Sequence, residues 1–220
     1  MTQTTNHRIW RELYEKSNNI MQHPDSAFVT LFNRNFSSGE KYKILDFGFG
    51  GGANLRMMCS KGHHLYGAEI SQEVIKYNEE RLKESGLKAH LVNLDSDVIP
   101  FPDGHFDAIS AWHVLGYNNL DSLKTTTSEF HRVIKSGGRI LGTIPAYGDV
   151  SHVSAKMLNS NEFVSNVSGQ KGAHIICLET ADDVSLALGW DANAIKIDLM
   201  QIPLLNGFVS RHWVFIYIKP

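Results

Sequence analysis

The stretch that decides the fold of this chain is Lys43-Ile44-Leu45-Asp46-Phe47-Gly48-Phe49-Gly50-Gly51-Gly52-Ala53. It is a short apolar run that ends in an acid, followed by a glycine-rich turn and by residues that can begin a helix. Glycines let the main chain approach a ligand closely, and the free N–H groups at a helix N-terminus favour the polar end of a ligand. The stretch therefore predicts a strand, a ligand-binding turn and a helix.

A second acid follows at the spacing typical of nucleotide-binding folds. The run Leu65-Tyr66-Gly67-Ala68-Glu69-Ile70 predicts a second strand with Glu69 near its end. In nucleotide-binding α/β folds, an acidic residue about 20 positions beyond the glycine turn accepts hydrogen bonds from ribose hydroxyls. The two segments together indicate a cofactor that contains a nucleoside.

The bulk composition favours a single cytoplasmic domain. A chain of 220 residues fits one α/β domain, and its net charge of -2 gives no general attraction for nucleic acid. No apolar run approaches the roughly 18 residues that span a bilayer. The two cysteines, Cys59 and Cys177, lie far apart and favour a reducing compartment. We expect no nucleic-acid partner, no membrane association, and a monomer or homodimer.

Predicted strands and helices alternate from residue 44 onward, which indicates a parallel sheet with helices on both faces. The end of the chain breaks this pattern, because the strand-like segments 194–201 and 212–218 are joined by a loop too short for a helical crossover. These two strands should pair antiparallel. We therefore expect a single Rossmann-like α/β domain, with a seven-stranded, mostly parallel sheet and a C-terminal antiparallel hairpin.

The pattern of elements divides the domain into four parts. They are a helical N-terminal cap at 1–40, a cofactor-binding core at 41–144, a lid over the acceptor site at 145–178, and a last helix with the terminal strand pair at 179–220. Within these parts the expected helices begin at Pro24-Asp25 and cover 53–60, 72–85, 121–135 and 181–188. The third, fourth and fifth strands are expected at 88–93, 106–111 and 139–144. Asp121 is the expected N-cap of its helix, and Gly137-Gly138 the expected terminator.

Further segments complete a family pattern. They are Asn93-Leu94-Asp95-Ser96, Val98-Ile99-Pro100-Phe101-Pro102-Asp103-Gly104-His105-Phe106-Asp107, Glu129–Arg139 and Ile144-Pro145. With the glycine turn and Glu69, they resemble the class I S-adenosylmethionine-dependent methyltransferases, especially the metal-independent, type 11-like small-molecule subgroup. The resemblance covers about residues 40–145. It implies methyl transfer from S-adenosylmethionine to a small-molecule acceptor, with S-adenosylhomocysteine as the product and no metal.

The resemblance also implies which residues hold the cofactor. The turn from Gly48 to Gly52 would pass under the methionine part, and Asp46 would order that turn and the amino end. Glu69 would accept hydrogen bonds from both ribose hydroxyls, and Asp95 would receive the adenine amino group. The complete set of expected cofactor-binding residues is Asp46, Phe47, Gly48, Gly50, Gly52, Glu69, Ile70, Asp95, Ser96, Ala111 and Trp112.

On the acceptor side, His113 is the candidate general base. It follows the fourth strand at the carboxyl edge of the sheet, where ligands bind, and an alcohol or amine acceptor must lose a proton. A purely structural or exposed histidine is an equally open interpretation. Oxygen is favoured over nitrogen as acceptor atom, because no acidic cage for a cationic amine is evident. The expected acceptor-binding residues are Tyr14, Tyr117, Tyr147 and His152, and Phe49 is expected to narrow the pocket.

Two other functions stay open at this point. Gly48-x-Gly50-x-x-Ala53 also satisfies the permissive dinucleotide pattern, which would suit an NAD(P)-dependent oxidoreductase. A non-catalytic cofactor-binding protein of the same fold would keep the same acids. The eleven histidines predict no metal site, because His63-His64 are adjacent and no HExxH motif is present.

Overall fold

The computed structural model describes residues 6, 8–10, 12, 23–36, 39–168 and 170–220. The strands of the main sheet are β1 (Lys43–Phe47), β2 (His64–Glu69), β3 (Ala89–Asn93), β4 (Phe106–Ala111), β5 (Ile134–Pro145), β9 (Ile195–Pro203) and β10 (Val209–Ile218). A small second sheet contains β6 (Lys156–Met157), β7 (Glu162–Val164) and β8 (His174–Ile176). The helices are α2 (Ser26–Asn35), α3 (Ala53–Ser60), α4 (Gln72–Glu84), α5 (Leu120–Val133), α6 (Val150–Val153) and α7 (Ala181–Leu188).

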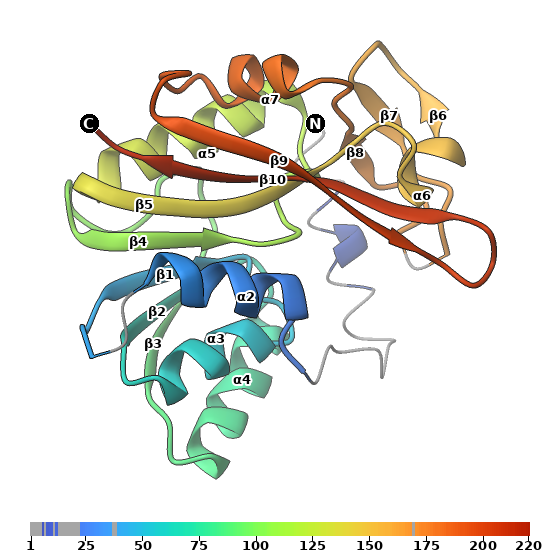
Figure 1. Cartoon of the computed structure of the whole chain (residues 1–220). Coiled ribbons are helices and arrows are strands. Elements are labelled where there is room, and N and C mark those ends of the chain that lie inside the picture. The colour runs from blue at the N-terminus through green and yellow to red at the C-terminus, as the bar shows by residue number, and fades with distance from the viewer. Residues whose placement is uncertain (1–5, 7, 11, 13–22, 37–38, 169) are drawn as a thin grey trace.

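The seven strands of the main sheet lie in the order β3-β2-β1-β4-β5-β10-β9 (Figure 1). Strands β1 to β5 pair in parallel, whereas β10 runs antiparallel to both of its neighbours. The predicted α/β fold with a C-terminal antiparallel pair is therefore confirmed. The order reverses beside β1, so a crevice opens at the carboxyl ends of the central strands, the usual ligand position in such sheets.

Helices cover both faces of this sheet (Figure 1). On one face α2, α3 and α4 bury Phe28, Leu55 and Val74 against the sheet, and on the other α5 and α7 bury their apolar sides. Strand β1 contributes to both cores because successive side chains point to opposite faces: Ile44 belongs to the first core and Leu45 to the second. The glycine turn after β1 is thus anchored by a strand that is buried on both sides.

The boundaries of α5 differ from the prediction. Asn119, not Asp121, is its N-cap, with Oδ1 accepting from the N–H of Ser122 at 2.7 Å, and Asp121 lies in the first turn. The helix ends at Val133, before the two glycines, because the backbone is already extended at Ile134. Gly137-Gly138 is therefore not the helix terminator. The pair lies inside β5, where the pairing with β4 shifts register.

The segment 145–178 is more regular than its weak periodicity indicated. It holds α6 and the antiparallel sheet β6-β7-β8, whose strands of two or three residues are too short to show an alternating pattern. This sheet packs its own small core against Ile9. Asn6 donates from Nδ2 to the backbone oxygens of Tyr117 and His174 and accepts from the N–H of His174 at 2.8 Å. The start of the chain is thereby tied to this segment.

Candidate cofactor and acceptor site

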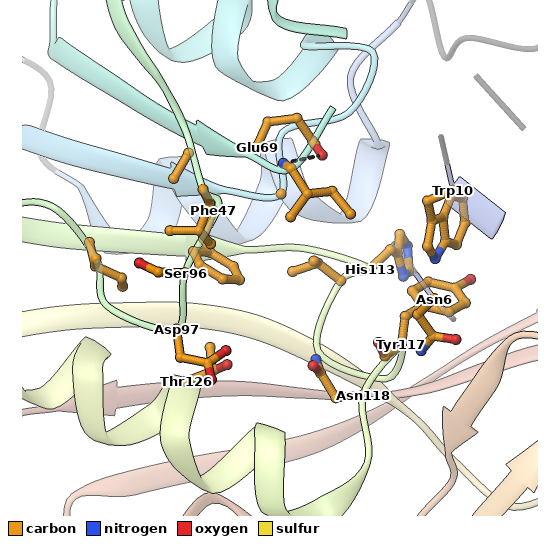
Figure 2. A pocket seen from close by; sticks show the side chains of 16 residues that line it. Asn6, Trp10, Phe47, Glu69, Ser96, Asp97, His113, Tyr117, Asn118 and Thr126 are labelled. Carbon is orange, nitrogen blue, oxygen red and sulfur yellow. Dashed lines mark hydrogen bonds between the residues drawn. The ribbon is translucent and has the colours of Figure 1, made fainter. Parts of the chain in front are cut away.

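One pocket lies at the carboxyl ends of β1, β2 and β4, with a volume of about 880 Å³ that includes its open mouth (Figure 2). Its wall combines the glycine turn, the end of β2 and the loop after β4 with the start of the chain. The lining residues are Asn6, Trp10, Phe47, Gly48, Ala68, Glu69, Ile70, Leu94, Ser96, Asp97, Ile99, His113, Val114, Tyr117, Asn118 and Thr126. Five predicted cofactor residues are among them, namely Phe47, Gly48, Glu69, Ile70 and Ser96.

The glycine turn requires glycine at Gly48 for two reasons. Its φ of 65° lies in the left-handed region that side chains rarely adopt. A Cβ atom at Gly48 would also lie 2.4 Å from Cγ2 of Val114 on the facing pocket wall. The N–H of Gly48 donates to the oxygen of Ala68 at 2.8 Å, so the turn is fixed to β2. The backbone therefore comes close to the pocket without a side chain in between.

Glu69 lies at the end of β2 and is only 5% exposed. Its Oε2 accepts from the N–H of Gly50 at 3.0 Å, and its Oε1 accepts more weakly from the N–H of Ser71. Oε1 also accepts from the N–H of Ile70 at 2.8 Å (Figure 2). Burial raises the pKa of Glu69, and the three N–H donors oppose that shift. The carboxylate thus braces the glycine turn while it lines the pocket. The sequence predicted only a ribose contact, and the bracing contact depends on the parallel alignment of β1 with β2.

A second brace of the turn is Asn78 in α4, which the sequence analysis did not single out. Its Nδ2 donates to the oxygen of Gly50 at 2.8 Å and to that of Val74 at 2.9 Å, and its Oδ1 accepts from Nη1 of Arg56. Asn78 is fully buried. Its spacing in the sequence indicates this position: Asn78 comes four residues after Val74 and four before Leu82, so it lies on the apolar face of the predicted helix. Such a buried amide needs hydrogen-bond partners, and the glycine turn supplies one.

Asp46 lies behind the turn, outside the pocket lining. It is 3% exposed and pairs in register with Ser110 of β4. Burial raises its pKa to about 7, the charge of Glu69 acts in the same direction, and the Ser110 hydroxyl opposes the shift. Because the pKa of this carboxyl group differs between the folded and unfolded states, its protonation makes the stability of the fold depend on pH.

That coupling predicts the pH dependence of an Asp46→Asn variant. Between the ordinary value of 3.8 and about 7, the folded state keeps a proton that the unfolded chain has released. The free energy of unfolding of the wild type therefore falls as pH rises through this window. The side chain of Asn at position 46 does not titrate, so the variant does not show this fall. We expect urea unfolding to show that the stability of the variant, relative to wild type, rises by more than about 1.4 kcal/mol from pH 5 to pH 8. A constant difference would contradict the assignment.

The adenine side of the pocket differs in one acid from the prediction. Asp95 is exposed and does not line the pocket, whereas Ser96 and Asp97 do. Apolar side chains of Leu94 and Ile99 complete this wall, which suits the flat face of a base.

Two predicted cofactor residues at the carboxyl end of β4 do not line the pocket. Ala111 is fully buried in the core, and the ring of Trp112 packs edge-on against Phe28 of α2 with centroids 5.3 Å apart. Phe49 is also outside the lining: a Cβ at Gly67 would lie 2.6 Å from its ring, so Phe49 covers β2 and does not narrow the pocket. Gly50 and Gly52 likewise contribute to the turn without lining the pocket.

His113 lines the other end of the pocket, in an unusual backbone conformation. Among the described residues it is the one non-glycine residue with positive φ, at 55°, a strained state that often marks functional positions. Its N–H donates to Oγ1 of Thr143 at 2.8 Å, and its Nδ1 lies 3.3 Å from the same oxygen. Its Nε2 lies 3.9 Å from Oδ2 of Asp25. The ring is thus placed by β5 on one side and by the start of α2 on the other.

Aromatic side chains gather beside His113. Trp10 and Tyr117 meet edge to face with ring centroids 4.5 Å apart, and Asn6 is bonded to the backbone of Tyr117 (Figure 2). Burial raises the pKa of Tyr117, so its hydroxyl stays protonated near neutral pH. Tyr117 is the predicted acceptor residue that lines the pocket.

Two further acceptor candidates, Tyr147 and His152, lie elsewhere. Tyr147 and His152 stack on each other with centroids 4.3 Å apart and do not line the pocket. Tyr14 falls outside the described residues. In the part of the chain that the structure describes, no group of three or more His, Cys, Asp or Glu residues could hold a metal ion. No helix among those residues is both long and apolar enough for a bilayer crossing.

Comparisons with known proteins find methyltransferases. Residues 44–138 match the family of methyltransferase domains. Over 134 residues the chain is 25% identical to the ubiquinone/menaquinone biosynthesis C-methyltransferase UbiE of Burkholderia multivorans, a match that covers 58% of this chain and 54% of that protein. The match thus spans about half the length of this curated relative.

Solved structures share the fold at low sequence identity. An S-adenosylmethionine-dependent methyltransferase of Methanosarcina mazei has a TM-score of 0.68 at 19% identity, covering 86% of this chain and 96% of that one. The 1,6-didemethyltoxoflavin-N1-methyltransferase of Burkholderia thailandensis was solved with bound 1,6-didemethyltoxoflavin and S-adenosylhomocysteine. It has a TM-score of 0.65 at 13% identity, and the match covers 99% of this chain and 85% of that one.

Strand order, glycine turn and domain match together define a class I methyltransferase fold with S-adenosylmethionine as its cofactor class. The methyltransferase-domain match over residues 44–138 and the solved structures support an S-adenosylmethionine-dependent methyltransferase, as the sequence motifs indicated.

Proposed function

We propose that this chain transfers a methyl group from S-adenosylmethionine to a small-molecule acceptor, with oxygen favoured over nitrogen as the accepting atom. The observation that carries the proposal is that one pocket joins two walls. At one wall stand the glycine turn and Glu69, which suit a nucleoside cofactor. At the other stand His113, Trp10 and Tyr117, which suit an organic acceptor.

The residues present fit the cofactor. Glu69 offers a buried carboxylate at the pocket wall, and two oxygens with several lone pairs can accept ribose hydroxyls in addition to the turn. The side-chain-free approach at Gly48 leaves room that a Cβ would fill. Ile70, Leu94 and Ile99 give an apolar surface for adenine. When bound, S-adenosylmethionine supplies a methyl group on a positively charged sulfur that is already an activated leaving group.

The protein then has two tasks, to orient the acceptor and to remove its proton. Orientation in a walled pocket can contribute up to about 7–11 kcal/mol to a bimolecular reaction. We assign the proton to Nε2 of His113, because Nδ1 is paired with the Thr143 hydroxyl. Oxygen is favoured because a neutral alcohol needs such a base to become a good nucleophile.

The charges of the pocket disfavour an anionic acceptor. The described lining residues include the carboxylates Glu69 and Asp97 but neither lysine nor arginine. A phosphate or carboxylate on the acceptor would meet like charge and would have no cationic partner. The edge-to-face pair of Trp10 and Tyr117 offers instead a surface for a flat, apolar molecule.

Calorimetric titration tests the cofactor part of this proposal. The purified chain is titrated with S-adenosylhomocysteine and, in a parallel cell, with NADH. We expect micromolar binding of the first and none of the second, followed by an acceptor screen that detects released S-adenosylhomocysteine. Preference for NADH would support the oxidoreductase alternative, and binding without turnover of any screened acceptor would support a non-catalytic protein.

A His113→Ala variant tests the base. We expect turnover of the identified acceptor to fall by about a hundredfold, the usual contribution of a positioned base, while affinity for S-adenosylhomocysteine stays nearly unchanged. Because His113 has positive φ, His113→Asn is the matched control for backbone conformation, since asparagine tolerates this region. Equal turnover of the variants and wild type would remove His113 as the base.

A further inference from the structure

Four titratable side chains from four separate segments meet at the His113 end of the pocket. Besides His113 they are Asp25 at the start of α2, His212 of β10 and Asp149 at the start of α6. The rings of His113 and His212 meet edge to face with centroids 4.5 Å apart. Nε2 of His113 lies 3.9 Å from Oδ2 of Asp25, and Nδ1 of His212 lies 3.7 Å from Oδ2 of Asp149. The cluster therefore consists of two neighbouring imidazoles, each with one carboxylate on its outer side.

The two acids are not equivalent. Asp149 is 3% exposed, and its carboxylate accepts from the N–H and hydroxyl of Ser151 and from the N–H of Arg211 at 2.7 Å. Its charge is thus engaged by protein donors. Oδ1 of Asp25 caps α2 and accepts from the N–H of Phe28 at 2.9 Å. Oδ2 of the same carboxylate faces His113.

The two imidazoles differ as well. His212 is partly buried, and this burial lowers its pKa to about 4, with the charge of His113 acting in the same direction and Asp149 and Asp25 opposing. His212 is therefore uncharged near neutral pH and packs against His113 as a neutral ring. His113 is 30% exposed toward the pocket and lowers the pKa of Asp25, as expected of a carboxylate that faces an imidazole.

We propose that Asp25 is a positioning residue for His113, which orients the imidazole and stabilises the positive charge that the ring gains with the acceptor proton. This inference rests on the proposed role of His113. At 3.9 Å, Oδ2 is too far to occupy Nε2 with a direct hydrogen bond but near enough to act through its charge. The acceptor O–H bond breaks, the electron pair stays on oxygen, the new N–H bond forms at Nε2, and the proton then leaves to water.

Asp25→Asn separates charge from structure. Asparagine is as good an N-cap as aspartate, so α2 keeps its cap while the cluster loses one negative charge. NMR titration of the His113 ring in the full chain is the readout, since it needs no acceptor. We expect the His113 titration midpoint to move to lower pH by about one unit, a tenfold loss of proton affinity. Asp25→Ser, which also caps, should give the same direction.

Asp182→Asn is the matched control, because it removes the same charge from an exposed position on α7. It should leave the His113 midpoint in place. An unchanged midpoint in folded Asp25→Asn would overturn the inference, as would an equal shift in the control. With an identified acceptor, Asp25→Asn should lower kcat and shift the pH profile with KM unchanged. This test is independent of the test of the proposed function, because the His113 titration can be measured even in a protein that does not bind S-adenosylhomocysteine.

Discussion

Replacing Glu69 by alanine is expected to weaken S-adenosylhomocysteine binding by more than tenfold. Hydrogen bonds to a charged group contribute about 1.5–3 kcal/mol each, and 1.4 kcal/mol corresponds to a factor of ten in Kd. The structure adds a second route to the same loss, because Glu69 also holds the N–H groups of Gly50 and Ile70. Calorimetric titration of the folded variant, with its fold checked by circular dichroism, measures the effect.

The two routes can be separated with a ligand that lacks one ribose hydroxyl. If Glu69 binds the ribose, the wild type binds 2′-deoxy-S-adenosylhomocysteine more weakly than the parent ligand. The loss of affinity caused by Glu69→Ala is then smaller for the deoxy ligand than for the parent ligand. The difference is the coupling energy of a double-mutant cycle. Equal losses with both ligands would show that Glu69 acts through the glycine turn alone. Unchanged affinity for the parent ligand would contradict both roles.

The core of the fold was predictable because its signals are local. The glycine turn follows directly on β1, and the boundaries of α3, β4 and α7 agree with the periodicity and the capping residues. Helix α2 begins where Asp25 predicts it. Where two capping signals competed, as at Asn119 and Asp121, the choice between neighbouring turns depended on packing that one sequence does not display.

The acceptor half of the site was less predictable for a physical reason. Asp25, Asp149 and His212 come from segments far apart in sequence, and only the sheet order brings them to His113. No periodicity or spacing encodes such a meeting. The same holds for Asn6, whose side-chain amide forms hydrogen bonds with residues more than a hundred positions later in the sequence. His113 itself was predictable because it follows a strand whose carboxyl end was already assigned to the ligand edge.

Replacing Gly52 by alanine is expected to destabilise the fold by about 3 kcal/mol or more, because overpacking and broken buried hydrogen bonds add to backbone strain. Gly52 caps α3 with φ of 70°, and a Cβ there would lie 1.8 Å from Oδ1 of Asn78. Asn78 has little freedom to move, since its amide holds Gly50, Val74 and Arg56. Urea unfolding measures the loss, and weaker S-adenosylhomocysteine binding should accompany it.

Gly86→Ala isolates the contribution of the backbone. Gly86 has nearly the same φ, 67°, but a Cβ there would meet nothing within 4 Å. Left-handed backbone at an alanine costs about 1–2 kcal/mol, so Gly86→Ala should lose only that amount and keep full cofactor affinity. The excess loss in Gly52→Ala then measures the displacement of Asn78. Equal losses in the two variants would mean that Asn78 yields without cost and does not brace the turn. An excess loss together with weakened binding would instead tie the rigidity of the turn to the buried amide behind it.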